Sequence, residues 1–434
     1  MTRKPHTRKA KTPSSSDTVD NVGATVLDGP VFSEPRPTPD PTKFQVKHPS
    51  DNPAYKKIDE LNREHKIEPL PFPAPRDLPE PQLTLAAVLD VNEASLESQV
   101  DSHGQLVFHA VGDTGSTRGP KDQNLVADKM TADFSDDDKD RPLFFFHLGD
   151  VIYSFGEGQY YYDQFYEPYR DYPAPIVALA GNHDGMVAPG TKAKTLAAFL
   201  ENFCATEFEV TPEAGGLSRT AQIQPGVFFT FEAPLLRILA LYSNTLEDPG
   251  VIANDNIGTS QLTYLQAALA RVQSENFKGA LILAHHHPIY TAGSQHGWSE
   301  DMLSQIDAIC NKTGIWPHAV LSGHAHNYQR FTRLHGQTQI PYIICGNGGH
   351  ALAKLQRKGA SALRTPLALA VPAGSDPVTL ENYDDEDFGY LRVVVTPSQL
   401  RVEYHPASDG DGAKTPDDFV TVDLTARRLV HFTG

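Results

Sequence analysis

Five short apolar runs, each ending in polar residues, recur along the middle of the chain. They are LVFHAVGD (106–113), LFFFHLGD (143–150), PIVALAGNHD (175–184), ALILAHHHP (280–288) and AVLSGHAHN (319–327). Continuous apolar runs of this length are typical of strands that are buried on both faces of a sheet. The polar residues that end them are then expected at the rim of a site.

Two other segments have the periodicity of amphipathic helices. In TSQLTYLQAALARVQ (259–273), one face carries Leu262, Leu265, Leu269 and Val272. Thr259 or Ser260 is expected to cap its start. DMLSQIDAICNKTG (301–314) is the second helix, with Gly314 as its stop signal. Strands that alternate with helices predict a layered α/β fold.

Both ends of the chain differ from this middle part. Residues 1 to about 80 are rich in Pro, Ser, Thr and Lys and have almost no periodic apolar pattern, so we expect a mobile or extended arm. Near the C-terminus, YLRVVVTPSQLRVEYHP (390–406) predicts a hairpin with TPSQ as its turn. FVTVDL (419–424) predicts a further strand.

Charge and composition exclude some classes of function. The net charge is −17, from 54 acidic and 37 basic residues, which disfavours binding to a nucleic acid duplex. A phosphorylated substrate stays open, because a metal centre can supply local positive charge. No apolar stretch reaches the roughly 18 residues that span a bilayer. The positively charged N-terminus has no apolar signal-peptide region after it. We therefore expect a cytoplasmic protein with no membrane association, and the sequence indicates no obligate protein partner.

The three cysteines of the chain are Cys204, Cys310 and Cys345. They are too few for a disulfide framework, and their wide spacing fits no zinc knuckle. Cys310 and Cys345 lie in apolar runs, so we expect them to be small buried hydrophobes.

The polar ends of the five apolar runs carry candidate metal ligands. In chain order these are Asp113, Asp150, Asn182 with His183, His286, and His324 with His326. A Gly-Asp after a strand is by itself commonly a turn, and one histidine at a strand end is weak support for a site. Here, however, every run ends in a possible ligand. Carboxylate, amide oxygen and imidazole together suit borderline to hard first-row cations.

The motifs GDTG, GDVIY, GNHD, LAHH and GHAH resemble, in order, the five blocks of calcineurin-like metallophosphoesterases. Within that superfamily the pattern is most similar to purple acid phosphatases, over about residues 106–350. The resemblance implies a four-layer α/β/β/α sandwich of two mixed sheets flanked by helices. This domain would cover residues 81–434, with C-terminal strands within 388–430. The implied activity is hydrolysis of phosphate esters, as an acid-phosphatase-like phosphomonoesterase, by attack of a metal-bound hydroxide.

The first block departs from the pattern of the wider superfamily. That block usually reads Asp-x-His, whereas this chain has Asp113, Thr114 and Gly115. In purple acid phosphatases the histidine is also missing, and a tyrosine three residues after the second block's aspartate replaces it. Tyr153 stands three residues after Asp150. Other tyrosines follow closely in the chain, so a non-ligating Tyr153 stays an alternative.

The resemblance implies two metal sites that share Asp150. The first would be formed by Asp113, Asp150, Tyr153 and His326. The second would be formed by Asp150, Asn182, His286 and His324. Because a phenolate is a hard anionic donor, we expect Fe(III) in the tyrosine-containing site and Fe(II), Zn or Mn in the other.

Several histidines need separate assignments. The family places its fourth-block ligand two residues before a proline, which selects His286, and strand alternation puts His285 and His287 on the opposite face. His147 lies mid-strand, so we expect a buried structural role for it.

Two further histidines resemble catalytic residues of the family. His183 resembles its substrate-facing histidine, which would stabilise the transition state or protonate the leaving group. His296, in a loop, resembles a further histidine at the site mouth, and an exposed loop histidine is the alternative. Asp184 is expected either to orient a neighbouring histidine or to close a turn.

Other functions stay open at this point. The same fold with two divalent ions and an unbound Tyr153 would be a phosphodiesterase or nucleotide hydrolase. A metal-binding regulatory protein with little turnover belongs to another class; loss of a ligand or of His183 would favour it, and all are present. The sequence indicates a small phosphorylated substrate but does not name it.

Overall fold

The computed structural model describes most of the chain from residue 69 onward. The described residues are 69–135, 137–187, 192–244, 249–293, 298–355, 362–408 and 415–433, together with Lys56, Lys57 and Glu60. Most of the arm expected over residues 1–80 lies outside them, and so does His296. In the described part, no helix combines the length and the apolar character needed to span a bilayer.

One sheet has seven strands in the order β16-β15-β14-β13-β2-β3-β4. Their bounds are β2 Leu106–Val111, β3 Phe145–His147, β4 Ile176–Ala178, β13 Gly389–Val395, β14 Gln399–Pro406, β15 Asp418–Asp423 and β16 Arg428–Leu429. Strands β2, β3 and β4 are parallel to one another, whereas β13 runs antiparallel to β2. The predicted C-terminal hairpin is β13 and β14, and the predicted further strand is β15.

The other sheet has nine strands in the order β1-β5-β6-β7-β8-β10-β9-β12-β11. Their bounds are β1 Gln82–Thr84, β5 Phe229–Ala233, β6 Leu236–Leu241, β7 Ala280–His285, β8 Ala319–Ser322, β9 Tyr328–His335, β10 Thr338–Cys345, β11 Leu367–Ala368 and β12 Val378–Asp384. The neighbours β6, β7, β8 and β10 are parallel. The apolar runs of the sequence predicted β7 and β8 but none of the other strands of this sheet.

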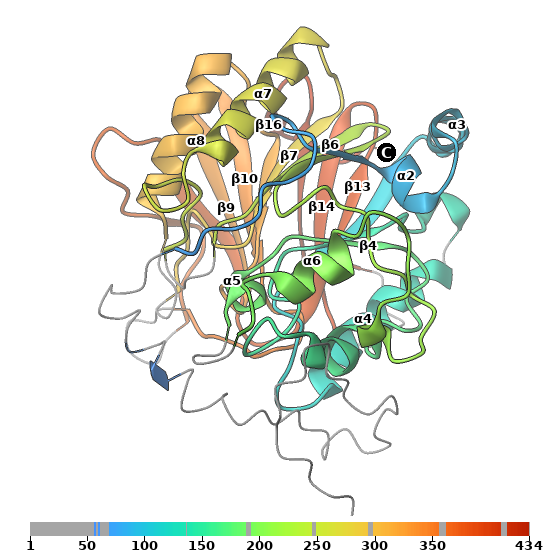
Figure 1. Ribbon diagram of the computed structural model, residues 1–434. Helices are drawn as coiled ribbons and strands as arrows, with labels where there is room; N and C mark the ends of the chain where they lie inside the picture. Colours follow the sequence, from blue (N-terminus) through green and yellow to red (C-terminus); the bar gives the residue numbers. More distant parts are fainter. Residues whose placement is uncertain are drawn as a thin grey trace, which may run out of the picture.

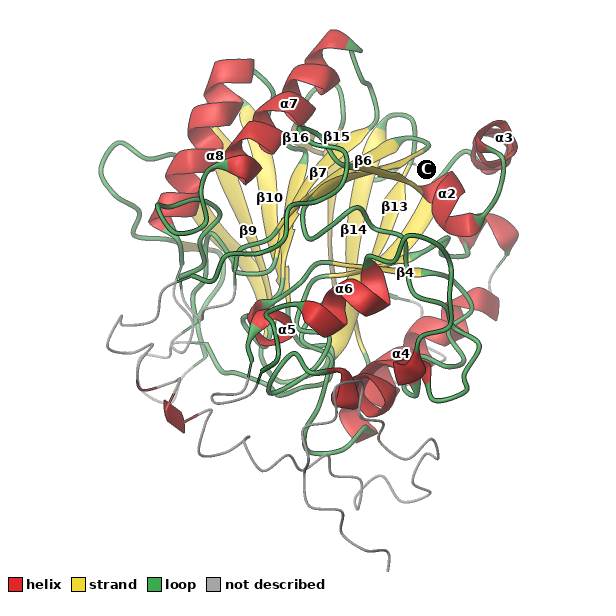
Figure 2. Cartoon of the chain, viewed as in Figure 1, coloured by secondary structure: helices red, strands yellow, loops and turns green. Residues whose placement is uncertain are grey.

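Helices flank the two sheets, and the short α5 lies at the ends of the strands (Figures 1 and 2). Their bounds are α2 Leu85–Leu89, α3 Glu93–His103, α4 Lys121–Ala132, α5 Asn182–Gly185, α6 Ala197–Phe203, α7 Ser260–Ser274 and α8 Glu300–Thr313. Short 3-10 turns are η1 Asp133–Ser135, η2 Asp138–Asp140, η3 Gly158–Tyr160 and η5 Pro212–Ala214, and η4 (Tyr162–Tyr166) is a π-helical turn. Helices α7 and α8 pack side by side over the nine-stranded sheet, and α4 packs against β13 (Figure 1).

Both predicted long helices are confirmed, with one correction at the start of α7. Thr259 precedes that helix with φ −121° and ψ 16°, and no side-chain hydrogen bond caps it. The extended backbone that brings a threonine hydroxyl over the first turn is therefore missing. At α8, Ser299 caps the start by accepting a hydrogen bond from Met302 N, and Gly314 ends the helix with φ 70°, as predicted.

The two sheets face each other across a common hydrophobic core. Phe144, just before β3, lies edge-on to Phe231 of β5 with ring centroids 4.9 Å apart. Tyr328 of β9 stacks on Tyr404 of β14 with centroids 4.0 Å apart. These contacts join one sheet to the other, so the fold is the mixed α/β arrangement of two mixed sheets flanked by helices that was predicted.

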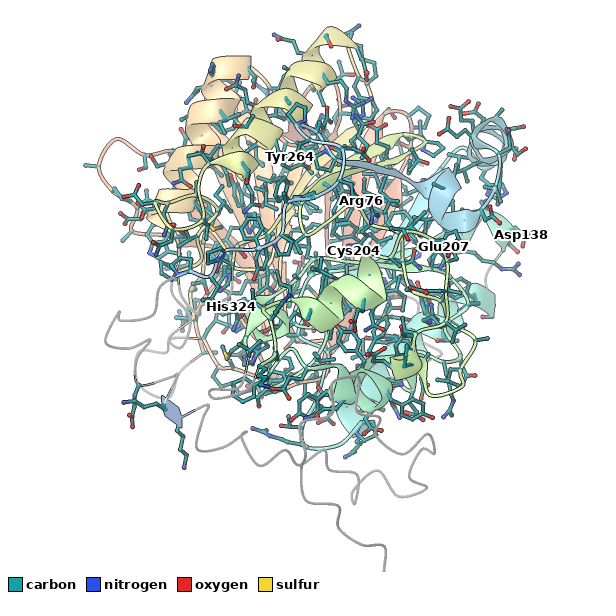
Figure 3. The ribbon with its side chains drawn as sticks, viewed as in Figure 1. Arg76, Asp138, Cys204, Glu207, Tyr264 and His324 are labelled. Atoms are coloured by element: carbon teal, nitrogen blue, oxygen red, sulfur yellow. The ribbon has the colours of Figure 1, made fainter. Side chains whose placement is uncertain are left out.

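The described part of the expected arm lies against this body. Phe72 packs edge-on against Tyr242, with ring centroids 5.2 Å apart. Arg76 donates to the backbone carbonyls of Cys204, Ala205, Ile223 and Gln224, and Figure 3 labels it beside Cys204. Glu80 forms an ion pair of 2.8 Å with Arg271 of α7. Cys310 and Cys345 are free and buried, as predicted.

Candidate metal centre

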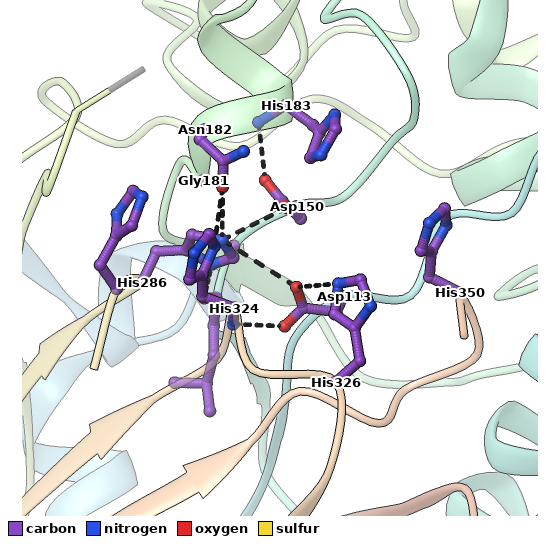
Figure 4. A network of polar contacts seen from close by, with 12 residues as sticks. Asp113, Asp150, Gly181, Asn182, His183, His286, His324, His326 and His350 are labelled. Carbon is purple, nitrogen blue, oxygen red and sulfur yellow. Dashed lines mark hydrogen bonds and ion pairs between the residues drawn. The ribbon is translucent and has the colours of Figure 1, made fainter. Parts of the chain in front are cut away.

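The candidate ligands follow the ends of strands from both sheets. Asp113 follows β2, Asp150 follows β3, Asn182 opens α5 after β4, His286 follows β7, and His324 and His326 follow β8. The carboxyl ends of parallel strands meet at one edge of a sheet, so these side chains converge there (Figure 4). They are almost fully buried, and His326 is the most exposed, with 15% of its side-chain surface accessible.

Three of these residues have an unusual backbone. Asp113, Asp150 and His324 have φ values of 58°, 54° and 65°, in the left-handed region. Such conformations cost non-glycine residues about 1–3 kcal/mol each and concentrate at functional sites. Gly149, with φ 96°, makes the turn into Asp150, and a Cβ on it would lie 2.5 Å from His286 Nδ1. The glycine before Asp150 is therefore required for close approach of the two sheets.

A first cluster contains donor atoms of Asp113, Asp150, Tyr153 and His326. Tyr153 Oη lies 3.0 Å from Asp113 Oδ1, 2.9 Å from Asp150 Oδ2 and 3.3 Å from His326 Nε2. His326 Nε2 lies 3.4 Å from Asp113 Oδ1. The structure thus brings together the four residues predicted for the first metal.

A second cluster adjoins the first and contains Asn182, His286 and His324 together with Asp150. His286 Nε2 lies 3.3 Å from Asp150 Oδ2 and 3.1 Å from Asn182 Oδ1. His324 Nδ1 lies 3.0 Å from the same amide oxygen. The potential ligand atoms of Asp150, His286 and His324 all lie within 4.8 Å of one another. Asp150 Oδ2 belongs to both clusters.

These separations fit two metal ions. Ligand atoms lie about 2.0–2.2 Å from a first-row cation, so neighbouring ligands are about 3 Å apart in an octahedral shell and about 3.5 Å apart in a tetrahedral one. The contacts between donor atoms of the first cluster run from 2.9 to 3.4 Å. The donor set of two carboxylates, one phenol oxygen, one amide oxygen and three imidazoles suits first-row cations. Asn182 Nδ2 is buried and has no hydrogen-bond partner among the described residues. The amide whose oxygen belongs to the second cluster therefore also carries an unused N–H donor.

The ligands are oriented by bonds to their remaining atoms. His286 Nδ1 donates to Leu148 O at 2.8 Å, which leaves Nε2 to point into the cluster. Asp150 Oδ1 accepts from the backbone N–H of His183 at 2.8 Å. Oδ2 is thus the Asp150 oxygen that contacts both clusters, while Oδ1 bonds to the backbone. The sequence did not reveal this division of roles between its two oxygens.

Asp184 holds two loops of the site together. Its carboxylate accepts from Gly181 N at 2.8 Å and from Val151 N and Ile152 N at 3.1 and 3.3 Å. It therefore closes the turn before α5, which was one of the two predicted roles, and also fixes the segment that leads to Tyr153. No described bond joins it to a histidine side chain.

Burial and mutual charge shift the pKa values in the two clusters. Burial raises the pKa of Asp113, and Asp150 raises it further. Burial also works to raise the pKa of Asp150, but His286 and His183 outweigh it and hold that pKa well below its usual range. Burial lowers the pKa of His286, yet Asp150 and Asp113 outweigh this effect and raise it to about 9. The centre is thus a buried anionic site that favours positive charge.

Tyr153 and His183 lie beside each other at the first cluster. Burial raises the pKa of Tyr153 well above its ordinary value, and Asp113 and Asp150 raise it further, so a hard cation is needed to stabilise a phenolate there. The His183 ring lies 4.3 Å from the Tyr153 ring between centroids. His183 Nδ1 donates to Ser154 O at 2.6 Å, which fixes the ring next to the cluster.

The other histidines have structural contacts, as predicted. His147 is fully buried, with Nε2 2.9 Å from Thr114 Oγ1. His285 Nδ1 donates to His287 O at 2.6 Å, and His287 Nδ1 lies 2.7 Å from Ser243 Oγ. Neither flanking histidine belongs to a cluster, which agrees with the choice of His286. The prediction that His287 lies on the opposite face is wrong, because β7 ends at His285 and the His287 ring packs against His324 with centroids 4.2 Å apart.

Sequence reasoning missed two residues that contact Tyr153. His350 stacks on the Tyr153 ring with centroids 3.5 Å apart and an angle of 12°. Gln164 bonds to both backbone polar groups of Tyr153. His350 follows a strand end, in IICGNGGH after β10, so the pattern that selected the candidate ligands, a polar residue after a buried strand, also applies to it. Gln164 stands in a tyrosine-rich segment and has no such signal.

Comparison with known proteins identifies the class that this fold and site define. The calcineurin-like phosphoesterase family model matches residues 106–328, about half of the chain, and the chain therefore belongs to that family.

Two Arabidopsis thaliana relatives are purple acid phosphatases by name, which supports the predicted resemblance. "Purple acid phosphatase 22" is 28% identical over 142 residues, or 32% of this chain and 29% of that protein. "Probable inactive purple acid phosphatase 9" is 22% identical over 293 residues, or 63% of this chain and 42% of that protein. The matches span less than half of either relative's length.

Several solved structures are also similar to this chain. "GAP50 the anchor in the inner membrane complex of Plasmodium" has a TM-score of 0.47 and 15% identity, covering 70% of this chain and 86% of that one. PhoD has a TM-score of 0.43 and 15% identity, covering 76% of this chain and 72% of that one. A dimetal phosphatase from Danio rerio has a TM-score of 0.40 and 11% identity, covering 74% of this chain and 99% of that one.

Proposed function

We propose that this protein is a binuclear-metal phosphomonoesterase of the purple acid phosphatase type. The observation that carries the proposal is the pair of donor-atom clusters that share Asp150 Oδ2. Within each set, neighbouring donor atoms lie about 3 Å from one another, and the two sets share one carboxylate oxygen. This arrangement is suited to two adjacent cations. We propose Fe(III) in the cluster of Tyr153, and Fe(II), Zn or Mn in the cluster of Asn182.

Two bound cations would supply Lewis acidity and a water of lowered pKa. The chain's own residues perform the remaining tasks. His183 is held by its Nδ1–H bond to Ser154 O and by its backbone N–H bond to Asp150 Oδ1. Its ring is thereby fixed beside the first cluster, where Nε2 would donate to a phosphoryl or leaving-group oxygen of a bound substrate. Asn182 Nδ2, which is buried and has no hydrogen-bond partner among the described residues, would be a second donor to such a substrate.

The first experiment is to measure metal content and visible absorption on one air-oxidised sample of the full chain. About two metals per chain, including iron, with a broad charge-transfer band are expected from a phenolate on Fe(III). Hydrolysis of p-nitrophenyl phosphate by the same sample completes the test. Asp138→Ala, a change in an exposed 3-10 turn, serves as the control and should leave all three readouts unchanged.

A second candidate is a phosphodiesterase or nucleotide hydrolase with two divalent ions. It is favoured by the present contacts of Tyr153, whose hydroxyl lies within hydrogen-bond distance of both carboxylates. Two metals without a charge-transfer band, together with faster hydrolysis of bis(p-nitrophenyl) phosphate than of the monoester, would establish this candidate. Two metals with turnover of neither ester would favour a metal-binding regulatory protein.

The proposal includes a small phosphorylated substrate and no nucleic acid duplex, membrane or obligate protein partner. A cytoplasmic location is part of it as well. A panel of phosphomonoesters and nucleotides tests the substrate class, and fractionation of cells that express the full chain tests the location.

A further inference from the structure

Tyr153 is held by its backbone in an unusual way. Its N–H donates to Gln164 Oε1 at 2.8 Å, and its carbonyl accepts from Gln164 Nε2 at 2.5 Å. One fully buried side-chain amide thus replaces the two hydrogen bonds that a neighbouring strand would provide. Because both backbone groups are bonded to one rigid planar group, the peptide planes on either side of Tyr153 are fixed together.

Gln164 is itself fixed by the elements around it. It lies in the π-helical turn η4, a type of turn that is frequent at functional sites. Its own carbonyl accepts from Gln123 Nε2 of α4 at 2.7 Å. On its other side, a Cβ at Gly115 would lie only 2.6 Å from Gln164 Oε1. The amide group therefore has little room to move away from Tyr153.

The ring of Tyr153 is held separately, by a residue of the other sheet. His350 lies after β10 of the nine-stranded sheet and stacks on the ring with centroids 3.5 Å apart. Its Nδ1 donates to Gly115 O at 2.9 Å, and its backbone N–H donates to Asp113 O at 3.0 Å. His350 is therefore held once by its backbone and once by its ring, while the ring packs flat against the phenol.

We propose that Gln164 and His350 are positioning residues that hold the Tyr153 oxygen in the first metal cluster. This inference rests on the proposed function, in which that oxygen binds the first cation. The phenol oxygen is the atom of Tyr153 farthest from the backbone, so a small rotation of backbone or ring is amplified there. Gln164 prevents the first rotation and His350 prevents the second.

The chain offers a matched control for Gln164. Gln224 is also fully buried and bonds to both backbone groups of one residue, Ala178. Ala178 N donates to Gln224 Oε1 at 2.8 Å, and Gln224 Nε2 donates to Ala178 O at 2.9 Å. Gln164→Met and Gln224→Met therefore remove the same two hydrogen bonds from equally buried sites, and only the first of them touches Tyr153.

The test compares these two variants of the full chain after iron loading. Both should lose a similar amount of Tm. Gln164→Met should also shift or weaken the visible charge-transfer band and lower kcat by about 10- to 100-fold, the range expected for a displacement of up to ~1 Å at a reacting centre. Gln224→Met should keep the wild-type band and kcat. Equal bands and equal kcat values in the two variants would overturn the inference.

His350 is tested in the same way, which covers the case in which Gln164→Met does not fold. His350→Ala should shift the band, and His350→Phe, which keeps a flat ring against Tyr153, should restore most of it. His335→Ala removes a histidine stacked on Trp316, with centroids 3.9 Å apart, and should leave the band unchanged. An unchanged band in His350→Ala would overturn the role of His350. If the iron-loaded wild type has no band, the phenolate ligation fails, and this inference fails with it.

Discussion

The seven-stranded and the nine-stranded sheet supply the candidate metal centre with different chemistry. The seven-stranded sheet provides the oxygen donors, which are Asp113, Asp150, Tyr153 and Asn182. The nine-stranded sheet provides the imidazoles, which are His286, His324 and His326. Neither sheet has a complete set for either cluster. Cations bound between them would therefore join the two halves of the fold as well as carry the chemistry.

The difference between the sheets is also one of charge. The carboxylates lie on one side of the junction, and the raised pKa of His286, about 9, reflects their field across it. The first cluster takes one imidazole from the nine-stranded sheet and the second takes two. The first cluster is therefore the more anionic, and under the proposed function it would hold the more highly charged ion.

The largest effect is expected from loss of the oxygen donor that the two clusters share. Asp150→Ala should empty both metal sites, because each cluster loses the same Oδ2 atom. Phosphomonoester turnover should fall by more than about 10³-fold, beyond the loss seen when one stabilising group is removed. Metal analysis and p-nitrophenyl phosphate hydrolysis measure both effects. Substantial activity in this variant would contradict the two-metal model.

His183→Ala should have the next largest effect, on turnover alone. Its side chain belongs to neither cluster, so about two metals per chain should remain. Loss of a proton donor at the phosphoryl position should lower kcat by about 10²-fold or more. Metal analysis of the same preparation is the internal control. A variant that loses its metals would show that His183 acts on the site mainly through structure.

A single imidazole from the nine-stranded sheet should matter for one cluster only. His326→Ala removes one donor from the first cluster and none from the second, so one metal should stay bound and the visible band should disappear. His324→Ala should do the reverse and keep the band. Metal content and visible absorption of both variants, measured side by side, test this division. Equal metal loss in the two variants would show that the clusters bind cooperatively.

The smallest effect on activity is expected at the other end of the junction between the sheets, at His318. Its Nδ1 accepts from Leu281 N of the nine-stranded sheet at 2.9 Å. Its Nε2 lies 3.0 Å from the carbonyl oxygen of Leu424, which follows β15 of the seven-stranded sheet. Burial and, after it, the charge of Arg427 lower the pKa of His318 to about 3, although the bond to Leu424 O and the charge of Asp423 work in the opposite direction.

This shift predicts how stability depends on pH. Because the folded-state pKa of His318 is below the unfolded value of 6.5, its contribution is fully present above pH 6.5 and is lost as pH falls towards 3. Each pH unit within that window costs up to about 1.4 kcal/mol. Denaturant unfolding at pH 7 and pH 5 should show a smaller decrease for His318→Asn than for wild type. Equal decreases in the free energy of unfolding would show that other groups cause the loss of stability at acid pH.

Much of the fold and site was predictable because the ligands end buried strands. Asp113, Asp150 and His286 each follow a continuous apolar run, and a strand end limits where a side chain lies. Strands such as β5 and β9 have no comparable polar ending, so the pattern did not distinguish them. The predicted cap of α7 was wrong because Thr259 has φ −121° and ψ 16°, a backbone conformation that the sequence does not reveal, and its side chain makes no capping hydrogen bond.

The parts of the site that the sequence did not predict depend on tertiary contacts. Gln164 reaches Tyr153 only because a π-helical turn places it there, and no local motif encodes that approach. The use of a single Asp150 oxygen by both clusters depends on the N–H of His183, from another strand end. His296 and most of the expected arm lie outside the described residues, so those predictions stay as they were made.

The left-handed backbone of three donor residues has a consequence for how such a site evolves. Asp113, Asp150 and His324 occupy conformations that glycine adopts without strain, and two of them are also buried carboxylates. Substitution of glycine there would relieve strain and remove buried charge while the two sheets kept their core. Once selection for catalysis is relaxed, drift at these positions should therefore discard the ligands and preserve the fold. This chain has Asp, Asp and His at the three positions, so none of these candidate ligands has been replaced by glycine.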